Sequence, residues 1–375
     1  MDQANILIIG GGVVGCAIAH AVSQRWQDVF LVERLPKLGM ATSTRNSGVI
    51  HSGIYYPKDS LKARHCVAGN RMMYEFCAKH NVPHRKTGKL VVAADAHEEA
   101  DLAALQKKGE GNGVTGLRMI GPAEIRAREP HIRGAAALEV PSTGIVSAED
   151  LVKTFARLAA DNGANIVSRA QVTSLEARGG MIRVGLRIGD AEDALEETIE
   201  ARCVVNAAGL YADEVAGMLG NNSWKIYPVR GEYCEIRGAR SSLINALVYP
   251  LPHGGGLSLG VHFTKTLWGT VLLGPTAKYV NEKDNYERDR LPIAAFAESA
   301  KTLLPEVEER DLQLGYSGLR PKLIAPDAQG IGEFVIERDA RVPQAIHLVG
   351  IESPGLTGCA SIAEQVAELV AETLA

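Results

Sequence analysis

Residues 5–33, NILIIGGGVVGCAIAHAVSQRWQDVFLVE, decide the fold of the N-terminal part of the chain. The apolar run Ile6–Ile9 predicts a buried parallel strand, and the apolar residues after Gly12 recur at helical spacing. A second apolar run, Val29–Val32, ends on Glu33. The stretch therefore predicts a strand, a glycine turn, a helix and a second strand in that order.

The glycines of this stretch follow the spacing G-x-G-x-x-G at Gly10, Gly12 and Gly15. Gly10 permits a tight turn, Gly12 lets the backbone approach a pyrophosphate, and Gly15 lets the helix pack closely on the strand. The helix that starts at Val13 and Val14 offers free N–H groups and a positive dipole to phosphate oxygens. The motif therefore predicts a dinucleotide site.

The acidic residue Glu33 ends the second strand, where a carboxylate can accept hydrogen bonds from the ribose of an adenosine. Its neighbour Arg34 either contacts the ribose or adenine edge or lies in solvent. These residues support a dinucleotide but do not distinguish NAD from FAD.

Length and composition limit the classes of protein to consider. A chain of 375 residues is long enough for two domains, and 46% hydrophobic with 22% charged residues is typical of a soluble globular protein. A net charge of −4 argues against a nucleic-acid surface. No apolar run approaches the roughly 20 residues of a membrane-spanning helix. The first strand follows the N-terminus directly, so we expect no signal peptide.

The cysteines show neither a C-x-x-C pair nor the spacing of a metal site, so we expect no metal and a reduced, buried set of thiols. Reduced thiols favour a cytoplasmic location. The six residues are Cys16, Cys66, Cys77, Cys203, Cys234 and Cys359.

Hydrophobic periodicity divides the rest of the chain into helices and strands. Helices are predicted over residues 61–80, 96–109, 121–130, 147–163, 212–219 and 283–310, and from about 359 to the C-terminus. Strands are predicted over residues 88–93, 164–168, 171–177, 181–188, 197–202 and 203–206, and again over 334–338 and 346–349. A β-rich block over 225–275, with runs at 226–230, 232–236, 256–263 and 270–273, predicts a mostly antiparallel sheet.

Two further stretches look like dinucleotide contacts: VVNAAG at 204–209 follows a strand, and GLTG at 355–358 opens the last helix. With the N-terminal motif they resemble the flavoprotein family that includes D-amino acid oxidase, sarcosine oxidase and glycerol-3-phosphate dehydrogenase. The resemblance covers nearly the whole chain and implies FAD, held non-covalently, rather than NAD.

The resemblance implies a fold of the α/β class: a Rossmann-like FAD-binding domain in three layers, with a mostly parallel sheet. An α+β substrate domain with an antiparallel sheet is inserted into it. We expect the FAD-binding domain to be discontinuous, at residues 1–85, 141–222 and 320–375, and the substrate domain to span 86–140 and 223–319.

A closer resemblance is to the L-2-hydroxyglutarate dehydrogenase/oxidase family. It rests on NSGVIHSGIYYPKDSLKARHCVAGNRMMYEFC (46–77), GKLVVA (88–93), PSTGIVS (141–147), AAGLYAD (207–213), PVRGEY (228–233) and GVHFT (260–264), in this order. The chain departs from the family at Gly318–Lys322, where G-V-R-A-Q is usual. It departs again at Glu352–Leu356, where N-A-P-S-P-A is usual. Both departures lie where the flavin ring and substrate are expected.

The glycine motif and the resemblance together assign the FAD contacts. The small polar stretch from 42 to 49 is expected to pass from pyrophosphate to flavin, the backbone of Val172 to contact adenine, and the helix start at Thr357 and Gly358 to direct its dipole at the flavin N1/C2 carbonyl. The full set is Gly10, Gly12, Val13, Val14, Gly15, Glu33, Arg34, Thr42, Ser43, Asn46, Ser47, Gly48, Val49, His51, Val172, Ala207, Ala208, Gly209, Arg320, Gly355, Leu356, Thr357 and Gly358.

Oxidation of a 2-hydroxy acid requires a base for the hydroxyl proton, and a histidine that titrates near neutral pH suits this role. His51 and His262 both lie in family-like motifs; His51 is the first candidate, and His262 is the alternative base or a substrate ligand. The fork of Arg320 suits a carboxylate. Further candidates for substrate contacts are Lys322, Arg230, Tyr55, Tyr56 and Tyr249.

The sequence thus predicts an FAD-dependent enzyme that transfers a hydride from an L-2-hydroxy acid to flavin N5, giving the 2-oxo acid. The alternatives are oxidation of a small amine or amino acid, oxidation of glycerol 3-phosphate, and a non-catalytic dinucleotide-binding module. The electron acceptor, a quinone or O₂, is left open. We expect a cytoplasmic protein with no nucleic-acid partner. If the electron acceptor is a quinone, peripheral attachment to a membrane is also possible.

Overall fold

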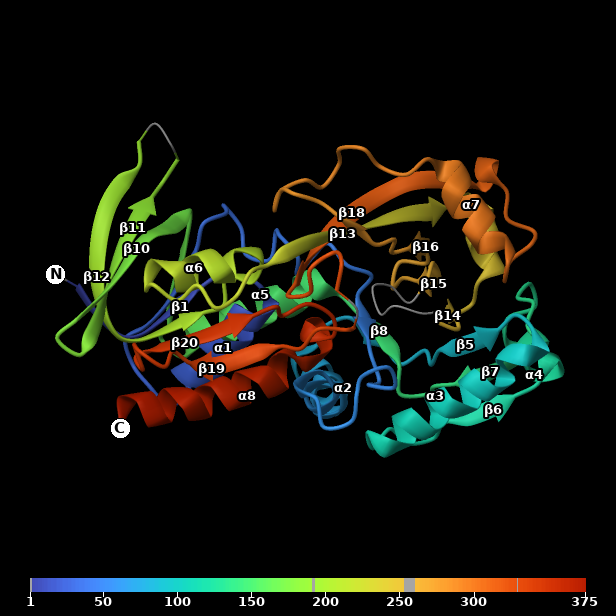
Figure 1. Ribbon diagram of the computed structural model, residues 1–375, viewed down its shortest axis with the longest axis horizontal. Helices are drawn as coiled ribbons and strands as arrows, with labels where there is room; N and C mark the ends of the chain where they lie inside the picture. The colour runs from blue at the N-terminus through green and yellow to red at the C-terminus, as the bar shows by residue number, and fades with distance from the viewer. Residues whose placement is uncertain (1, 191–192, 253–259, 329) are drawn as a thin grey trace.

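The computed structural model describes residues 2–190, 193–252, 260–328 and 330–375. Within these ranges the strands form two large sheets on opposite sides of the molecule and one small sheet (Figure 1). Both chain ends lie on the side of the first large sheet (Figure 1).

The first large sheet contains eight described strands and is parallel at its centre. Its order is β10-β11-β12-β1-β2-β9, and β20 pairs with both β12 and β19. The strands are β1 (Asp2–Ile9), β2 (Val29–Glu33), β9 (Asn165–Ser168), β10 (Ala170–Arg178), β11 (Met181–Ile188), β12 (Leu195–Asn206), β19 (Val335–Arg338) and β20 (Ala345–Val349). Ile6 in β1 lies opposite Cys203 on one side and Val29 on the other. The apolar runs of the sequence are therefore strands buried on both faces.

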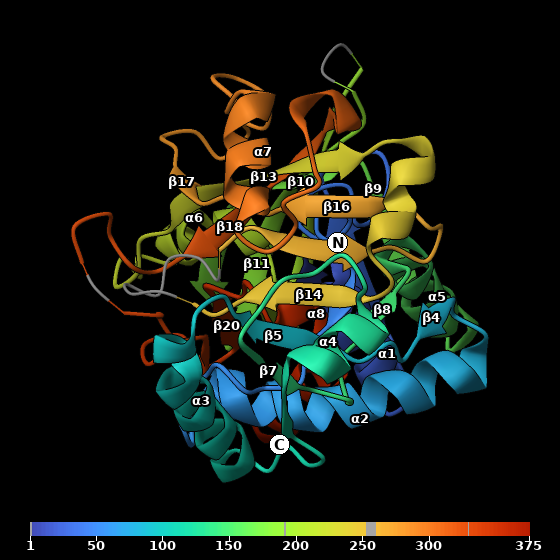
Figure 2. The ribbon, with the colours of Figure 1, turned by 90° about the vertical axis from the view of Figure 1, so that its right-hand side faces the viewer.

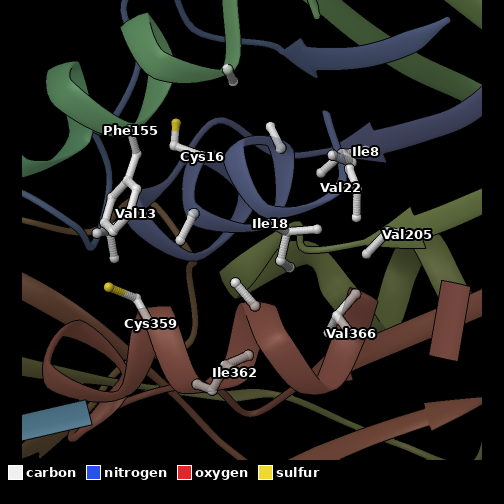
Figure 3. Close-up of a cluster of buried hydrophobic side chains, with 14 of the residues drawn as sticks. Ile8, Val13, Cys16, Ile18, Val22, Phe155, Val205, Cys359, Ile362 and Val366 are labelled. Atoms are coloured by element: carbon white, nitrogen blue, oxygen red, sulfur yellow. The ribbon is translucent and has the colours of Figure 1, made fainter. Parts of the chain in front are cut away.

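Helix α1 (Val13–Ser23) lies between this sheet and the helices α5 (Ala148–Asp161) and α8 (Gly355–Leu374). Figure 3 shows its apolar residues pointing toward both helices and the sheet. Ile18 of α1 and Ile362 of α8 are fully buried in this cluster. Each such side chain contributes about 1.5–3 kcal/mol, so the cluster fixes the glycine turn that precedes α1.

The other described helices surround the two sheets. Gly69 of α2 crosses the start of α8 so closely that any Cβ would overlap the carbonyl oxygen of Thr357. The helices around the two sheets are α2 (Leu61–His80), α3 (Glu99–Gly111), α4 (Pro122–Arg128), α6 (Ala212–Met218) and α7 (Ile293–Lys301). Short 3₁₀ helices cover Ala96–Glu98, Gly209–Tyr211, Gly238–Leu243 and Glu309–Asp311.

The second large sheet has nine described strands and is antiparallel except where β14 and β5 run parallel. Its order is β17-β13-β16-β15-β14-β5-β7-β6, and β18 pairs with β13 (Figure 2). The strands are β5 (Leu90–Ala93), β6 (Arg118–Ile120), β7 (Ala136–Glu139), β13 (Tyr227–Ile236), β14 (Leu247–Pro250), β15 (His262–Lys265), β16 (Val271–Gly274), β17 (Lys278–Tyr279) and β18 (Leu312–Lys322). The third sheet consists of β3 (Val49–Ile50), β8 (Gly144–Val146) and β4 (His84–Arg85).

A mostly parallel sheet covered by helices and a separate antiparallel sheet confirm the predicted fold class. The first sheet takes its strands from residues 2–33, 165–206 and 335–349, and the second takes its strands from 90–139 and 227–322. The predicted domain boundaries stay a prediction.

The predicted helix over 283–310 is confirmed only over α7, Ile293–Lys301. Residues 302–310 form turns and the start of a 3₁₀ helix, and the first ten residues of the predicted range are not helical. The guanidinium of Arg230 explains the difference. It donates to Asn285 Oδ1, to the carbonyl oxygen of Arg288 and to that of Asp289. Asp289 has a φ of +53°, outside the helical region. These tertiary contacts override the local helical pattern.

Smaller differences concern element ends. The expected strands 197–202 and 203–206 are one strand, β12, and the last helix begins at Gly355, four residues before Cys359. The expected strand 256–263 lies partly outside the described residues, and β15 begins at His262.

Candidate active site

The glycine turn between β1 and α1 has the shape that the sequence predicts. Gly10 has a φ of +109°, and a Cβ there would lie 2.5 Å from the carbonyl oxygen of Ala207. A Cβ on Gly15 would overlap the carbonyl oxygen of Gly10. Glycine is thus required at both positions, because the turn, α1 and the end of β12 are in backbone contact.

The N-terminus of α1 is open to a ligand. Gly12 caps the helix without a side-chain hydrogen bond. The hydroxyl of Ser43, from the polar stretch 42–49, accepts a hydrogen bond from the Val13 N–H at 2.9 Å. Unpaired N–H groups in a first helical turn, a positive dipole and a nearby hydroxyl are the groups that bind phosphate oxygens. The turn therefore fits the pyrophosphate of a dinucleotide.

Glu33 uses both carboxylate oxygens to shape this turn. It accepts hydrogen bonds from the N–H of Gly11 at 2.7 Å and of Leu35 at 2.8 Å. Each oxygen keeps a second acceptor position, so contact with a ribose stays a prediction. Arg34 stacks on the ring of Tyr211, 3.9 Å from its centroid.

A cavity of about 810 Å³ extends from the glycine turn to β18. It brings together most of the predicted site residues, namely Gly12, Val13, Val14, Gly15, Thr42, Ser43, Asn46, Ser47, Val49, His51, Tyr55, Tyr56, Ala207, Gly209, Tyr249, His262, Arg320, Lys322, Gly355 and Leu356. Predicted residues outside its lining are Gly10, Glu33, Arg34, Gly48, Val172, Ala208, Arg230, Thr357 and Gly358. Val172 is a buried residue of β10, and its backbone contact with adenine stays a prediction.

The polar stretch 42–49 is folded by its own side chains and docks on β18. The Asn46 amide donates to the Ser43 carbonyl at 2.7 Å, and its oxygen accepts from the Gly48 N–H at 2.8 Å. Thr42 Oγ1 donates to the carbonyl of Leu319 at 3.0 Å. This docking places the predicted cofactor loop beside Arg320.

The Thr357 side chain makes two contacts within the protein, and its predicted contact with FAD stays a prediction. Its buried hydroxyl accepts from the His51 N–H at 3.0 Å and donates to the Val49 carbonyl at 3.4 Å. It therefore joins the start of α8 to the segment that carries His51. The first turn of α8 still lines the cavity through Gly355 and Leu356, so a helix dipole directed at the flavin stays a prediction.

His51, Tyr55, Tyr249 and His262 line one part of the cavity. The rings of Tyr249 and His262 stack with centroids 3.6 Å apart and an interplanar angle of 11°. Behind them lies Lys89, which is 2% exposed. Its Nζ donates to the Tyr55 hydroxyl at 3.2 Å and lies 4.5 Å from the centroids of the Tyr55 and Tyr249 rings.

The His51 imidazole is neutral in this environment. Burial, together with the positive charges of Lys89 and Arg320, lowers its pKa to about 3. Its Nδ1 is buried without a hydrogen-bond partner among the described residues, and the residue lines the cavity. His51 is thus held as a free base with two cations nearby.

Arg320 is one of the cations that line the cavity. It lies on β18, and its Nη1 is buried with no hydrogen-bond partner within the described ranges. An unpaired buried guanidinium nitrogen is costly, and a bound carboxylate would satisfy it with a charge-assisted hydrogen bond. The geometry supports the predicted role of Arg320.

Lys322 lines the cavity but already has an anionic partner. Its Nζ lies 3.0 Å from Glu352 Oε1, which also accepts from Lys62 Nζ at 2.8 Å. Burial opposes ionisation of Glu352, but the two lysines outweigh it and lower the pKa of this carboxyl group. The three residues form a buried ionic cluster in the cavity wall.

The predicted contact between Arg230 and the substrate is a wrong prediction. Arg230 is fully buried, does not line the cavity, and pairs with Glu232 at 2.8 Å in addition to its contacts with residues 285–289. Its guanidinium stabilises the segment before α7, so it has no donor directed at a substrate.

Lys62, Lys89 and Glu352 are among the residues of the site that were not predicted. Lys62 looks like an ordinary polar residue near a helix start, and Lys89 precedes an apolar strand in which an inward lysine is unexpected. Glu352 lies in a stretch where the sequence departs from the family pattern. That departure was the one available signal for the ionic cluster.

Replacing Lys89 by methionine is expected to increase the free energy of unfolding at pH 6 by on the order of 3 kcal/mol. Burial lowers the pKa of Lys89 from 10.5 to about 7, so the native protein must bury a cation below pH 7. Between pH 7 and 10.5 the unfolded chain binds more protons at this residue, and the wild-type protein gains stability as the pH rises. The advantage of the variant should therefore shrink toward pH 10.

Urea unfolding of both proteins at pH 6 and pH 10 measures this difference. Lys153→Met is the control, since Lys153 is an exposed residue of α5. A difference between the Lys89 variant and the wild type that does not change with pH would contradict the prediction.

All six cysteines are buried and free, as expected. Among the described residues, no group of three or more His, Cys, Asp or Glu side chains has the arrangement of a metal site. Across the same part of the chain, no helix is both long and apolar enough to cross a lipid bilayer.

Comparison with known proteins gives the family. Residues 5–369 match the model of the FAD dependent oxidoreductase family. The mitochondrial L-2-hydroxyglutarate dehydrogenase of Arabidopsis thaliana is 34% identical, over 98% of this chain and 83% of that protein. The L-2-hydroxyglutarate dehydrogenase of Indibacter alkaliphilus is 31% identical, over 97% of this chain and 98% of that protein.

Solved structures agree with this result. FAD-bound L-alpha-glycerophosphate oxidase from Mycoplasma pneumoniae superposes with a TM-score of 0.88 at 26% identity, over 99% of this chain and 95% of that one. Glycine oxidase from Geobacillus kaustophilus shares the fold, with a TM-score of 0.83 at 20% identity and coverage of 99% and 95%. The match over residues 5–369, the full-length relatives and the glycine turn together show that this chain belongs to the family of FAD-dependent oxidoreductases.

Proposed function

We propose that the protein oxidises L-2-hydroxyglutarate, or an L-2-hydroxy acid closely similar to it, to the corresponding 2-oxo acid. The observation that carries the proposal is the unpaired buried Nη1 of Arg320, in the same cavity as the neutral His51. Oxidation of a 2-hydroxy acid requires a cation that binds the substrate carboxylate and a group that accepts the hydroxyl proton. The names of the relatives that match over nearly the whole chain support the same substrate.

The residues present fit FAD. The N-terminus of α1 with Ser43 suits the pyrophosphate, and the cavity continues from there past the stretch 42–49 to Arg320. When bound, FAD supplies the acceptor for the hydride that leaves C2 of the substrate. The first turn of α8 and the backbone of residues 46–49 are the elements that would hold its ring system.

The chain's own residues bind and orient the hydroxy acid. Arg320 holds the carboxylate next to C2, while Tyr55 and Tyr249 border the same part of the cavity. His51 accepts the hydroxyl proton on its imidazole ring. The stacked pair Tyr249–His262 closes one wall and makes His262 a substrate contact, or the alternative base that the sequence already offered.

Anaerobic addition of L-2-hydroxyglutarate to the purified FAD-loaded protein tests this proposal. The visible flavin absorption should bleach, and 2-oxoglutarate should form in an amount equal to the flavin. D-2-hydroxyglutarate is the matched control, because it differs only in configuration at C2. Flavin that stays oxidised with the L-acid would overturn the proposed substrate.

L-α-glycerophosphate is the second candidate substrate, because the glycerophosphate oxidase is 26% identical to this chain over almost its full length. A small amine or amino acid remains the other alternative from the sequence. Both belong in the same anaerobic experiment, and bleaching by either, without bleaching by L-2-hydroxyglutarate, would reassign the enzyme.

The path of the electrons after substrate oxidation stays a prediction. A quinone or O₂ is the expected acceptor. We likewise propose a cytoplasmic location, with peripheral contact to a membrane if the acceptor is a quinone. The division into an FAD-binding part (1–85, 141–222 and 320–375) and a substrate part (86–140 and 223–319) is proposed on the same sequence grounds.

A further inference from the structure

The ionic cluster of Lys62, Glu352 and Lys322 is built from three separate parts of the chain. Lys62 comes from the first turn of α2, Lys322 ends β18, and Glu352 lies in the segment before α8. The three side chains are 3%, 6% and 6% exposed, and all three residues line the large cavity. The two ion pairs thus join three segments that lie far apart in the sequence.

The charges of the cluster do not cancel. Both ammonium groups contact the same oxygen, Oε1 of Glu352, at 2.8 and 3.0 Å. Lys62 Nζ also donates to the carbonyl oxygen of Ile331 at 3.4 Å, whereas Lys322 Nζ has Glu352 as its single hydrogen-bond partner in the described part of the chain. Two cations and one anion leave a surplus positive charge, and an ammonium group has three donors. The cluster is therefore incomplete without a further anion.

Electrostatics within the cavity lead to the same conclusion. Burial lowers the pKa of Lys322, and Glu352 counteracts the effect only in part. A second anion beside Lys322 would offset the cost of burying its charge. No acidic side chain other than Glu352 is bonded to either lysine among the described residues, so the missing anion would have to come from a ligand.

The position of the cluster relative to Arg320 defines the ligand. Arg320 and Lys322 are separated by one residue on β18, and both line the cavity, so they point to the same face of the strand. Two residues along a strand correspond to about 6.6 Å. The carboxyl carbons of a five-carbon dicarboxylate are joined through four C–C bonds of ~1.5 Å and lie roughly 5 Å apart when extended. The two cationic positions therefore match the two ends of such a molecule.

We propose that Lys322, together with Lys62 and held in place by Glu352, is a second anion-binding subsite that binds the carboxylate remote from the oxidised carbon and makes the enzyme selective for dicarboxylates. The inference rests on the proposed function for the assignment of Arg320 to the carboxylate next to C2. Lys322 is the direct ligand in this arrangement. Glu352 is a positioning residue, because it fixes both ammonium groups through one oxygen.

The test compares two substrates that differ only at the remote end, L-2-hydroxyglutarate and L-2-hydroxypentanoate, in which a methyl group replaces the remote carboxylate. The variant is Lys322→Met, which keeps the straight side chain and leaves a one-to-one ion pair between Lys62 and Glu352. We expect kcat/KM for the dicarboxylate to fall about ten- to a hundredfold, and kcat/KM for the monocarboxylate to stay within twofold. Lys322→Arg should restore much of the selectivity, and Lys153→Met, on the exposed surface, should leave both values unchanged.

Binding of glutarate to the FAD-loaded protein, measured by calorimetry, gives a readout that does not depend on turnover. We expect Lys322→Met and Lys62→Met each to weaken glutarate binding about tenfold or more, with the FAD content unchanged. Equal losses for both substrates, or unchanged glutarate affinity in both variants, would overturn the subsite. Glutarate binding that depends on Lys322, in an enzyme that does not oxidise L-2-hydroxyglutarate, would keep the subsite and overturn the proposed function.

Discussion

Replacing Arg320 by leucine is expected to lower kcat/KM for L-2-hydroxyglutarate about a thousandfold. The Nη1 of Arg320 is buried without a partner in the cavity, so it is available for a substrate carboxylate. Two charge-assisted hydrogen bonds contribute about 1.5–3 kcal/mol each, and each 1.4 kcal/mol corresponds to a factor of ten. Most of the loss should appear in KM, because the carboxylate is bound in the substrate as well as in the transition state.

The FAD content of the leucine variant is measured alongside, because Arg320 is also a predicted FAD contact. The pyrophosphate site at the start of α1, with Ser43, does not include its side chain. Arg320→Lys is the informative partner variant, since it keeps the charge but loses the planar fork; an intermediate loss is expected. Arg157→Leu, at an exposed residue of α5, controls for removal of a positive charge. A leucine variant with wild-type KM would contradict the role of Arg320.

The N-terminal half of the cofactor site could be predicted from sequence because its signals are local. The apolar runs of β1 and β2 and the glycines between them belong to one stretch of about thirty residues. Backbone contacts leave no room for a Cβ at Gly10 and Gly15. A position that must be glycine can be recognised directly in the sequence, because the residue there is glycine. The three strands β10, β11 and β12 were found for a similar reason, since antiparallel neighbours follow one another in the chain.

Arg230 shows why the substrate side was harder to predict. Its position in a family-like motif suggested a carboxylate ligand, but the guanidinium turns away from the cavity and binds Glu232 and the segment before α7. The same contacts replace the expected helix over 283–292 with irregular structure. Both errors have one cause, a buried tertiary interaction between residues more than fifty positions apart, which no local pattern reveals.

Thr357 and Lys89 show the same limit within the site. A threonine at a helix start suggested a cap or a flavin contact, but not that its hydroxyl holds the backbone of His51. Lys89 was missed because a lysine before an apolar strand is usually exposed, whereas here the aromatic faces of Tyr55 and Tyr249 enclose its ammonium group. The sequence indicates which residue types are present, but only packing decides which of them face one another.

Replacing His51 by asparagine is expected to lower kcat about a thousandfold, while His262→Asn should have a smaller effect. A positioned general base contributes about 10²–10⁴-fold, and asparagine cannot accept the proton. Only a modest change in KM is expected for His51→Asn, because Arg320 still holds the carboxylate. If His262→Asn abolishes turnover and His51→Asn does not, the base is His262. A double variant with full turnover would exclude both histidines.

The pH dependence of kcat/KM tests whether the pKa of His51 is lowered. In the ligand-free protein, burial and the charges of Lys89 and Arg320 together lower the pKa of His51 to about 3. The imidazole is therefore neutral throughout the working range, and kcat/KM should not fall between pH 7 and pH 5 as it would for an ordinary histidine. A loss of activity with a pKa near 6.5 that disappears in His51→Asn would show that the pKa of His51 is not lowered in the free enzyme.

Burial is the main cause of the low pKa of His51, and of the two nearby cations Arg320 is the one whose charge a bound carboxylate would neutralise. Arg320 lowers the pKa of His51 only while its charge is unpaired, and a bound carboxylate neutralises that charge beside the imidazole. Substrate binding should therefore raise the pKa of His51 at the moment when its basicity is needed. NMR titration of ¹⁵N-labelled histidine with and without glutarate checks this sequence of events. An unchanged His51 signal upon saturation with glutarate would show that the carboxylate does not control the base.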